Sequence, residues 1–270
     1  MIPRIMLVLF ALLCASPVRA QILPPNAAGI SAGHEHFRVT DVEAAERFWT
    51  ALGGVIAPMG QVRVVKFPGI IVMLARATAE TPVSGGTEGT TVDLIRFRVK
   101  NLNNTLAALD SAGYKPLPGS TARSASLMTL EKAKVSLVED ASLPTAVATD
   151  ALIMKVPNVA EAAAWYAKWF GGKVTGEGDA TFVDIPGMQM RFSRAATPVA
   201  GTRGRALDHI GFEVNNLEAF MKTMANEGVT ISRPFQPAPP TVQPVVTSLG
   251  FVTDPWGTYI ELNEGFSKIK

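Results

Sequence analysis

One short pattern of hydrophobic and polar residues recurs along the chain. Hydrophobic and polar side chains alternate over a few residues, a polar turn follows, and hydrophobic side chains then recur with the 3.6-residue period of a helix. The alternation indicates a strand, and the longer period indicates an amphipathic helix that follows it. The pattern occurs four times, starting at Phe37, Phe97, Met154 and Phe212.

Each predicted helix has a polar residue at its start and a glycine just beyond its end. Short polar side chains suit the helix N-cap, and glycine readily takes the left-handed conformation that ends a helix. The predicted helices cover residues 42–52, 102–112, 159–170 and 217–227. The polar residues before them, which suit the turn or the helix N-cap, are Asp41, Asn101, Asn158 and Asn216.

Short strands follow the helices, and they repeat with their connectors. A strand, a Pro-Gly turn and a second strand span residues 62–76 and again residues 180–194, and each is followed by a similar Thr- and Gly-containing connector. Chance amphipathicity does not explain a repeated connector. We therefore predict an α+β protein of four βαβββ units, numbered 1 to 4 along the chain. Units 1 and 2 form a domain over residues 30–142, and units 3 and 4 form a domain over residues 149–266.

The first 20 residues have the layout of a secretory signal peptide. Arg4 precedes an apolar run over residues 5–14, and the small residues Val18 and Ala20 stand where a signal peptidase cleaves. We expect a mature chain that begins near Gln21 and lies in the periplasm or outside the cell. The alternatives are an uncleaved anchor or a buried first helix.

Loss of this segment changes the chemistry of the chain. The single cysteine, Cys14, leaves with the segment, so the mature protein has neither a disulfide nor a thiol nucleophile. Without Arg4 and Arg19, the remainder of the 25 basic residues equals the 23 acidic residues in number. A nearly neutral chain without basic clusters is a poor partner for nucleic acid, and none of its later apolar runs is long enough for a membrane.

Two segments carry a resemblance to a known family. The run Asp208-His209-Ile-Gly before Phe212, and the run from Thr253 to Leu262, resemble the opening and closing strands of a vicinal oxygen chelate (VOC) module. This superfamily includes glyoxalases, bleomycin resistance proteins and extradiol dioxygenases. The resemblance covers essentially the whole mature chain and is weakest in unit 2. It implies a tandem of four modules whose sheets curl into two half-barrel cups that bind small molecules.

The resemblance also implies two inward-facing positions in each unit, one on the first strand and one on the last. The first-strand positions in units 1 to 4 are His34, Leu94, Ala151 and His209. The last-strand positions, aligned on Gly69, Ala133, Gly187 and Gly257, are Met73, Leu137, Arg191 and Glu261. Ligand-type side chains therefore occur only in units 1 and 4.

This distribution bears on how the units pair. If neighbouring units pair, neither cup holds three protein ligands. If unit 1 pairs with unit 4, His34, His209 and Glu261 meet in one cup, and the cup of units 2 and 3 is purely structural. Two histidines and one carboxylate with open coordination positions suit a divalent metal ion, namely Fe(II), Mn(II), Ni(II) or Zn(II).

Two further side chains are candidates for catalysis. His36 lies two residues from His34 and faces the same side of the strand, so it is either the ligand itself or an acid–base group. Tyr259 lies on the same side of its strand as Glu261, so its hydroxyl could contact a substrate, with core packing as the alternative role.

The expected function is that of an exported, metal-dependent VOC enzyme that acts on a small substrate chelated through two oxygens. The closing segment resembles that of extradiol dioxygenases, although Phe251 stands where those enzymes carry a substrate-binding tyrosine. A glyoxalase would need a fourth ligand at Met73 and a thiol cosubstrate, which is not expected outside the cytoplasm. We therefore favour a ring-cleaving dioxygenase over a lyase or isomerase. The alternatives are a metal-free protein that sequesters a small molecule and a structural protein with a vestigial site.

Overall fold

The computed structural model describes residues 22–59 and 62–266 of the chain. The predicted signal peptide, residues 1–20, lies outside the described residues. Within them, no helix combines the length and the apolar character that crossing a membrane requires.

The four predicted units are present, three of them complete. Unit 1 comprises β1 (Ile30–Val39), α1 (Val42–Ala51), β2 (Val55–Met59), β3 (Val62–Phe67) and β4 (Ile70–Arg76). Unit 2 comprises β5 (Val92–Val99), α2 (Leu102–Ser111), β6 (Ser124–Met128) and β7 (Lys134–Glu139). Unit 3 comprises β8 (Val147–Val156), α3 (Val159–Phe170), β9 (Lys173–Thr175), the short helix η1 (Gly178–Ala180), β10 (Thr181–Ile185) and β11 (Met188–Arg194). Unit 4 comprises β12 (Leu207–Val214), α4 (Leu217–Asn226), β13 (Thr230–Pro237), β14 (Ser248–Thr253) and β15 (Tyr259–Glu264).

Unit 2 departs from the predicted βαβββ order. Between α2 and β6 the described chain forms turns instead of a strand. This segment contains Pro116 and Pro118, which have no backbone N–H to donate to a neighbouring strand. Unit 2 is therefore a βαββ unit, in keeping with its weaker resemblance to the family.

The helix ends follow the predicted chemistry with one exception. The side chains of Asp41, Asn101 and Asn158 accept hydrogen bonds from backbone N–H groups in the first turns of their helices. Asn216 also stands at the N-cap position of its helix, but it takes the left-handed conformation (φ 55°, ψ 50°), and its side chain makes no capping hydrogen bond within the described residues. Asparagine tolerates this conformation better than most residues, which explains why the turn forms without glycine.

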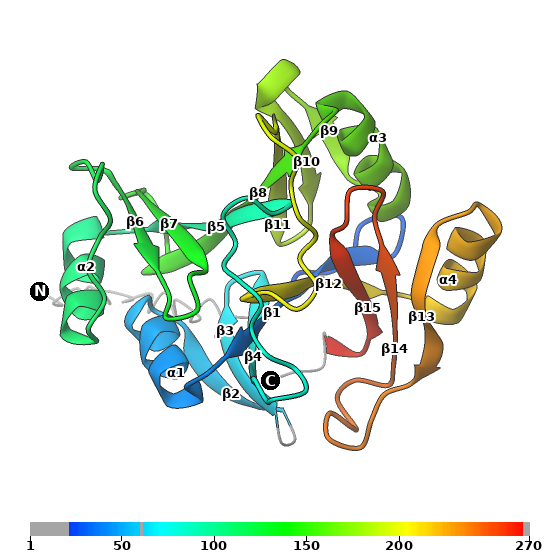
Figure 1. The fold of residues 1–270 in the computed structure, drawn as a ribbon, viewed down its shortest axis with the longest axis horizontal. Coiled ribbons are helices and arrows are strands. Elements are labelled where there is room, and N and C mark those ends of the chain that lie inside the picture. Colours follow the sequence, from blue (N-terminus) through cyan, green and yellow to red (C-terminus); the bar gives the residue numbers. More distant parts are fainter. Residues whose placement is uncertain (1–21, 60–61, 267–270) are drawn as a thin grey trace, which may run out of the picture.

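The sheets show how the units pair. One sheet has the order β13-β14-β15-β12-β1-β4-β3-β2, which joins units 1 and 4, and the other has the order β6-β7-β5-β8-β11-β10-β9, which joins units 2 and 3 (Figure 1). In the first sheet β1 runs antiparallel to β12, with His36 opposite His209. Of the two pairings left open by the sequence, the one between units 1 and 4 forms. The halves 30–142 and 149–266 each contribute one unit to each sheet, and as domain boundaries they remain a prediction.

A hydrophobic core fixes the two sheets relative to each other. It contains buried residues of all four units, for example Phe37, Phe97, Phe192 and Phe212. Contacts between units are close: the rings of Phe170 on α3 and Phe212 on β12 stack with centroids 4.0 Å apart. A second, smaller apolar cluster lies on the other face of the first sheet and includes Met59, Val64, Ile71, Leu249 and Phe251. This second cluster lines the cup of units 1 and 4, called cup 1 below.

One buried charge-bearing group lies within the β1 strand at the core. Glu35 is fully buried, and neither oxygen of its carboxyl group has a hydrogen-bond partner among the described residues. Burial raises the pKa of Glu35 from its ordinary value of 4.5 to about 8. Glu35 is therefore uncharged in the folded protein at neutral pH.

This burial predicts a pH-dependent cost to stability. Between pH 4.5 and about 8 the carboxyl group of Glu35 ionises in the unfolded chain and stays protonated in the folded one, so the folded state loses stability as the pH rises. Each unit of pKa difference corresponds to about 1.4 kcal/mol, so the loss is on the order of a few kcal/mol. Urea unfolding of Glu35→Gln should show a gain in stability relative to wild type that grows from pH 5 to about 8. The exposed control Glu227→Gln should show no such trend, and a pH-independent difference for Glu35→Gln would contradict the prediction.

Candidate metal centre

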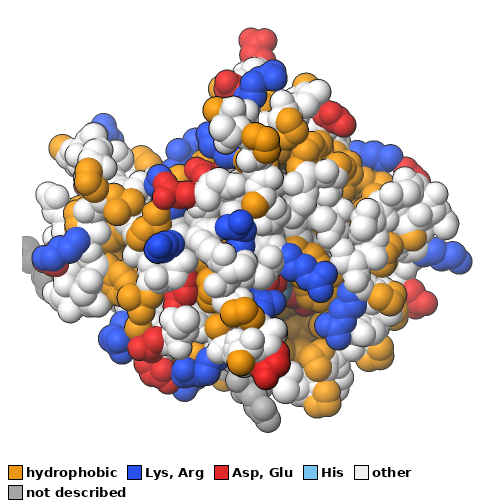
Figure 2. All heavy atoms as spheres, in the orientation of Figure 1, with side chains coloured by type: hydrophobic (Ala, Val, Ile, Leu, Met, Phe, Trp, Pro, Cys, Tyr) orange, Lys and Arg blue, Asp and Glu red, His pale blue; other side chains and the backbone are white. Residues whose placement is uncertain are grey.

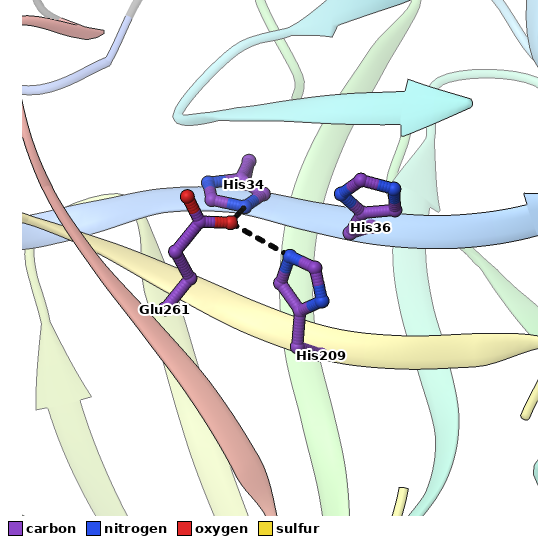
Figure 3. A group of neighbouring side chains, drawn as sticks. All are labelled: His34, His36, His209 and Glu261. Carbon is purple, nitrogen blue, oxygen red and sulfur yellow. Dashed lines mark hydrogen bonds and ion pairs between the residues drawn. The ribbon is translucent and has the colours of Figure 1, made fainter. Parts of the chain in front are cut away.

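Four ligand-type side chains converge in cup 1. His34 and His36 come from β1, His209 from β12 and Glu261 from β15, and their ligand atoms lie within 4.8 Å of one another (Figure 3). The three strands are neighbours in the sheet, and Gly211 lies opposite His34 on one side and beside Glu261 on the other. The structure thus brings together His34, His209 and Glu261, the three predicted metal ligands, and adds His36 to them.

The spacing of these groups fits a divalent metal ion. Glu261 Oε2 lies 2.8 Å from His209 Nε2 and 3.2 Å from His34 Nε2. A metal with bonds of about 2.0–2.2 Å holds neighbouring ligand atoms about 3 Å apart. Among the described residues, neither ring nitrogen of buried His34 makes a well-aligned hydrogen bond, and Nδ1 of His36 has no hydrogen-bond partner either. A bound cation would satisfy nitrogens that are otherwise costly to bury.

A glycine makes room for the first of these rings. A Cβ atom on Gly211 would lie 2.1 Å from the imidazole of His34, so no other residue fits there without moving the ring. Phe266 stacks on the same imidazole with ring centroids 4.8 Å apart. Glu213 positions Phe266 by accepting hydrogen bonds from the backbone N–H groups of Gly265 and Phe266, both at 2.9 Å. Sequence reasoning missed these supporting residues, although Gly211 stands in the quoted Asp-His-Ile-Gly motif.

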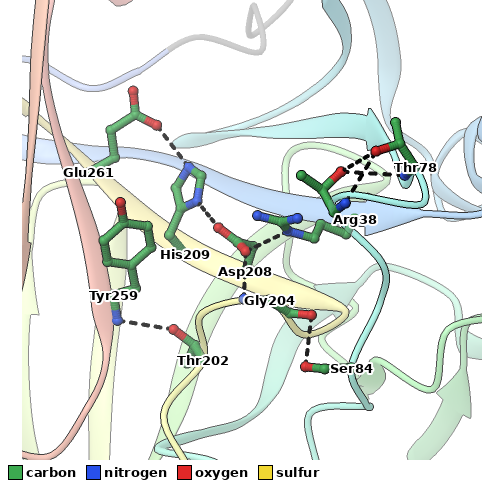
Figure 4. A network of polar contacts seen from close by, with 10 residues as sticks. Arg38, Thr78, Ser84, Thr202, Gly204, Asp208, His209, Tyr259 and Glu261 are labelled. Atoms are coloured by element: carbon green, nitrogen blue, oxygen red, sulfur yellow. Dashed lines mark hydrogen bonds and ion pairs between the residues drawn. The ribbon is translucent and has the colours of Figure 1, made fainter. Parts of the chain in front are cut away.

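A chain of hydrogen bonds orients the ligands (Figure 4). His209 Nδ1 donates to Asp208 Oδ1 at 2.6 Å, which directs Nε2 of the same ring toward Glu261. Asp208 is itself held by Arg38 Nε at 2.6 Å and by the backbone N–H of Gly204 at 2.7 Å. Asn263 Nδ2 donates to Glu261 Oε1 at 2.7 Å, so the other carboxylate oxygen faces the histidines.

The electrostatics of the cluster favour a cation. Burial lowers the pKa of His34 despite the opposing effect of Glu261, and burial followed by the charges of His209 and His34 lowers the pKa of His36 well below its usual range. Burial also acts to lower the pKa of His209, but hydrogen bonds to Asp208 and Glu261 outweigh it and raise that pKa. Burial would raise the pKa of Glu261, yet its contacts with His209 and His34 hold it well below its usual range. The site therefore offers one carboxylate and two neutral imidazoles, and the proton between His209 and Glu261 is the one a metal would displace.

A cavity of about 360 Å³ opens onto these side chains. His36, His209 and Glu261 form its polar end, and Arg233 and Arg76 also line it. Figure 2 shows a recess with hydrophobic walls between the positions of β4 and β14, with basic side chains near its edge.

The proline-rich stretch 234–244 contributes to the cavity wall. Its first part belongs to β13, and the following loop, residues 238–247, supplies Pro239, Val242 and Val246 to the lining.

Tyr259, the second predicted catalytic residue, lies beside the cluster. Its ring stacks on Phe251 with centroids 4.8 Å apart and lies edge-on to His209 at 5.8 Å, and the Arg203 guanidinium lies 4.8 Å from its centroid. Phe251 and not Tyr259 belongs to the cavity lining. These contacts give Tyr259 a packing role against His209, and a catalytic role for its hydroxyl stays a prediction.

The register of the second sheet identifies the equivalent positions in the other cup, called cup 2 below. Leu94, Ala151 and Arg191 occupy the places of His34, His209 and Glu261, as the alignment predicted. The place of Met73 is taken by Ser136, which pairs with Arg96 as Met73 pairs with His36.

The predicted alignment was therefore one residue off in unit 2, where it assigned Leu137. The positive φ of Gly69 (98°) recurs at Lys132 (63°) and not at Ala133, on which that alignment was based. Even so, none of the four equivalent positions in cup 2 carries a histidine or a carboxylate.

Comparisons with known proteins agree with this geometry. Residues 149–262 match the model of the Glyoxalase/Bleomycin resistance protein/Dioxygenase superfamily. Glyoxalase I from Zea mays has a similar structure (TM-score 0.67, 15% identity, 88% of this chain and 94% of that chain covered). A putative dioxygenase from Bacillus subtilis subsp. subtilis str. 168 is also similar (TM-score 0.62, 13% identity, 87% and 85% covered). No curated protein sequence matches the chain. The predicted resemblance to the VOC superfamily is confirmed, and at these identities the two solved structures show a shared fold.

The geometry predicts one divalent metal ion in cup 1. His209→Ala and Glu261→Ala each remove a ligand, and Gly211→Ala displaces the ring of His34, so all three variants should lose stoichiometric metal. The measurement is metal content after incubation with Fe(II), Mn(II), Ni(II) or Zn(II) and removal of free ions. Arg191→Ala, the cup 2 counterpart of Glu261→Ala, should bind as wild type does. Wild-type protein that stays metal-free with all four ions would contradict the prediction.

Proposed function

We propose that this chain is an exported, metal-dependent enzyme of the VOC superfamily, acting on a small substrate that binds the metal through two oxygen atoms. The observation that carries this proposal is the convergence of three histidines and a glutamate, of which His36, His209 and Glu261 line a cavity. A purely structural cluster would not need an opening of this size beside it.

His34, His209 and Glu261 would hold the metal. Two histidines and one carboxylate leave positions open for a chelating substrate, and Fe(II), Mn(II), Ni(II) and Zn(II) all accept such ligands. When bound, the ion would polarise the coordinated oxygens and, if it is Fe(II), would also supply redox chemistry toward dioxygen.

The remaining residues of the site have roles that follow from their contacts. His36 is held neutral, lies with its ring centroid 4.3 Å from that of His209, and lines the cavity. It is therefore placed to accept a proton from a substrate hydroxyl. Asn263 also lines the cavity, and its Oδ1 has no hydrogen-bond partner among the described residues, which leaves an acceptor for the same substrate. Phe251, Val242 and Leu249 form apolar walls that exclude water.

Ring-cleaving dioxygenase chemistry is favoured over lyase or isomerase chemistry. The closing segment resembles that of extradiol dioxygenases, and the apolar walls suit the flat face of an aromatic diol. A glyoxalase reaction has less support, because the place of a fourth ligand is occupied by Met73, which lines the same cavity.

The second candidate function is that of a metal-free protein that sequesters an apolar small molecule. The observation in its favour is the wall of the cavity, which is built largely from aliphatic and aromatic side chains.

Oxygen uptake separates these two functions. Fe(II)-loaded protein incubated with an aromatic vicinal diol should consume oxygen and form a ring-cleaved product with new visible absorbance. His36→Ala should retain metal and lower kcat by about 10²–10⁴-fold, because it removes the proposed proton acceptor. Arg191→Ala in cup 2 should leave the rate unchanged. Metal-loaded protein that binds such diols without oxygen uptake or chemical change would contradict the enzyme and support the sequestering protein.

Export is tested separately. If residues 1–20 are a cleaved signal, intact mass should show a mature chain that starts at or near Gln21, recovered outside the cytoplasm. Replacing two leucines of the apolar run, Leu7 and Leu9, with arginine should retain the full-length chain in the cytoplasm. Exported material that still carries residues 1–20 would contradict cleavage.

A further inference from the structure

We propose that cup 2, the cup of units 2 and 3, binds a small oxyanion, a carboxylate or a phosphate group, on the side chains of Arg98 and Arg191, with Arg96 beside them. This site is distinct from the metal centre and does not depend on the function proposed for cup 1.

The two cups have equivalent positions on their strands. The register of the sheets places Arg96 where cup 1 has His36, and Arg191 where cup 1 has Glu261. At the two other positions of the cluster, uncharged Leu94 and Ala151 replace His34 and His209. The substitutions turn a set of cation ligands into a set with two positive charges. A site that attracts a cation in one cup is thereby replaced by one that repels cations in the other.

The carboxylate of Asp150 is not sufficient to neutralise the guanidinium groups around it. Asp150, the counterpart of Asp208, accepts a hydrogen bond from Arg96 Nε at 2.5 Å. Arg98 Nε lies 3.6 Å from Asp150, and Arg191 Nη2 lies 3.4 Å from it. Arg98 also contacts Asp140 at 3.0 Å. Three guanidinium groups thus share two carboxylates, whereas in cup 1 Asp208 pairs with a single arginine, Arg38.

Two of the arginines have an N–H donor without a hydrogen-bond partner among the described residues. Nε of Arg98 and Nε of Arg191 make no hydrogen bond within the described part of the chain, and the contact of Arg191 with Asp150 is long. A guanidinium has five N–H groups in a planar fork, which matches the oxygens of a carboxylate or phosphate. Because both Nε atoms are buried, an oxyanion would bind to the exposed remainder of the Arg98 and Arg191 guanidinium groups.

The cluster is accessible from a cavity of about 410 Å³. Arg98, Arg191 and Asp150 line one part of it, together with Thr149. The side chains of Arg98, Arg191 and Asp150 are 43%, 30% and 13% exposed, respectively. Asp184 lines the cavity as well, and its hydrogen-bond donors are the uncharged groups Gln189 Nε2 at 2.6 Å and Thr175 Oγ1 at 3.3 Å, so an anion would be repelled from that part. We therefore place the anion at the arginine end.

Calorimetric titration of the full mature chain with inorganic phosphate and, separately, with acetate tests the proposal and distinguishes the two ligand classes. Each titration is done on metal-loaded protein and on protein dialysed against a chelator, since an anion could also bind a metal in cup 1. At least one anion should bind saturably in both preparations. Arg191→Gln should weaken that binding by about tenfold to a hundredfold, the effect expected for a charge-assisted hydrogen bond. Arg191→Lys, which keeps the charge without the fork, should weaken it less.

The matched control is Arg63→Gln, which removes a guanidinium that pairs with Glu46 outside cup 2 and is 56% exposed. It should bind as wild type does. Thermal unfolding of each variant establishes that it is folded. The proposal is overturned if neither anion binds at millimolar concentration, if Arg191→Gln and Arg63→Gln weaken binding equally, or if binding disappears with the metal.

Discussion

The structure depends on the antiparallel pairing of β1 with β12. These strands are far apart in the sequence, and their pairing joins unit 1 to unit 4 and leaves units 2 and 3 to form the other sheet. It places His36 opposite His209 and, through Gly211, brings His34 beside Glu261. Neither half of the chain holds the complete cluster by itself. A loop closure of this length costs conformational entropy, which the shared hydrophobic core of all four units must offset.

Much of this arrangement could be predicted from the sequence, because it rests on local patterns. Hydrophobic periodicity located β3, β4 and β11 with their observed bounds, and glycines marked the helix ends. The complementary distribution of ligand types, one in unit 1 and two in unit 4, pointed to the observed pairing. Three features were not predicted, because they depend on backbone geometry that residue types do not reveal. The positive φ of Lys132 shifted the alignment of unit 2, the prolines near residue 117 removed a strand, and Asn216 took a left-handed conformation at its N-cap position.

The residues of the candidate site could be predicted only in part, because contacts between side chains on different strands depend on the register of those strands. His36 faces the same side of β1 as His34, so sequence alone could not decide whether it approaches the other ligands. In the structure it does, because β1 and β12 are in a register that sets it directly across from His209. The support given by Phe266 and Glu213 involves residues at the ends of two strands, and only the folded chain brings their backbone and side chains together. Glu35 lies one residue away on the opposite face of the strand, and its carboxyl group enters the core without a hydrogen-bond partner among the described residues.

The two cups share one carboxylate whose position is set by the backbone. In the first sheet the register between β1 and β12 shifts after His36, and Asp208 is the extra residue of the shift. In the second sheet the register between β5 and β8 shifts after Arg96, and the extra residue is Asp150. Such a bulge turns a side chain away from the alternating pattern of its strand. Each aspartate can therefore reach the arginine two residues beyond the inward-facing His36 or Arg96, that is, Arg38 or Arg98. The same bulged carboxylate orients an imidazole where its neighbours are candidate metal ligands and gathers guanidinium groups where they are arginines. The difference in chemistry between the cups thus follows from the side chains placed around a backbone feature that both sheets share, and the proposed cation and anion sites require no change of fold.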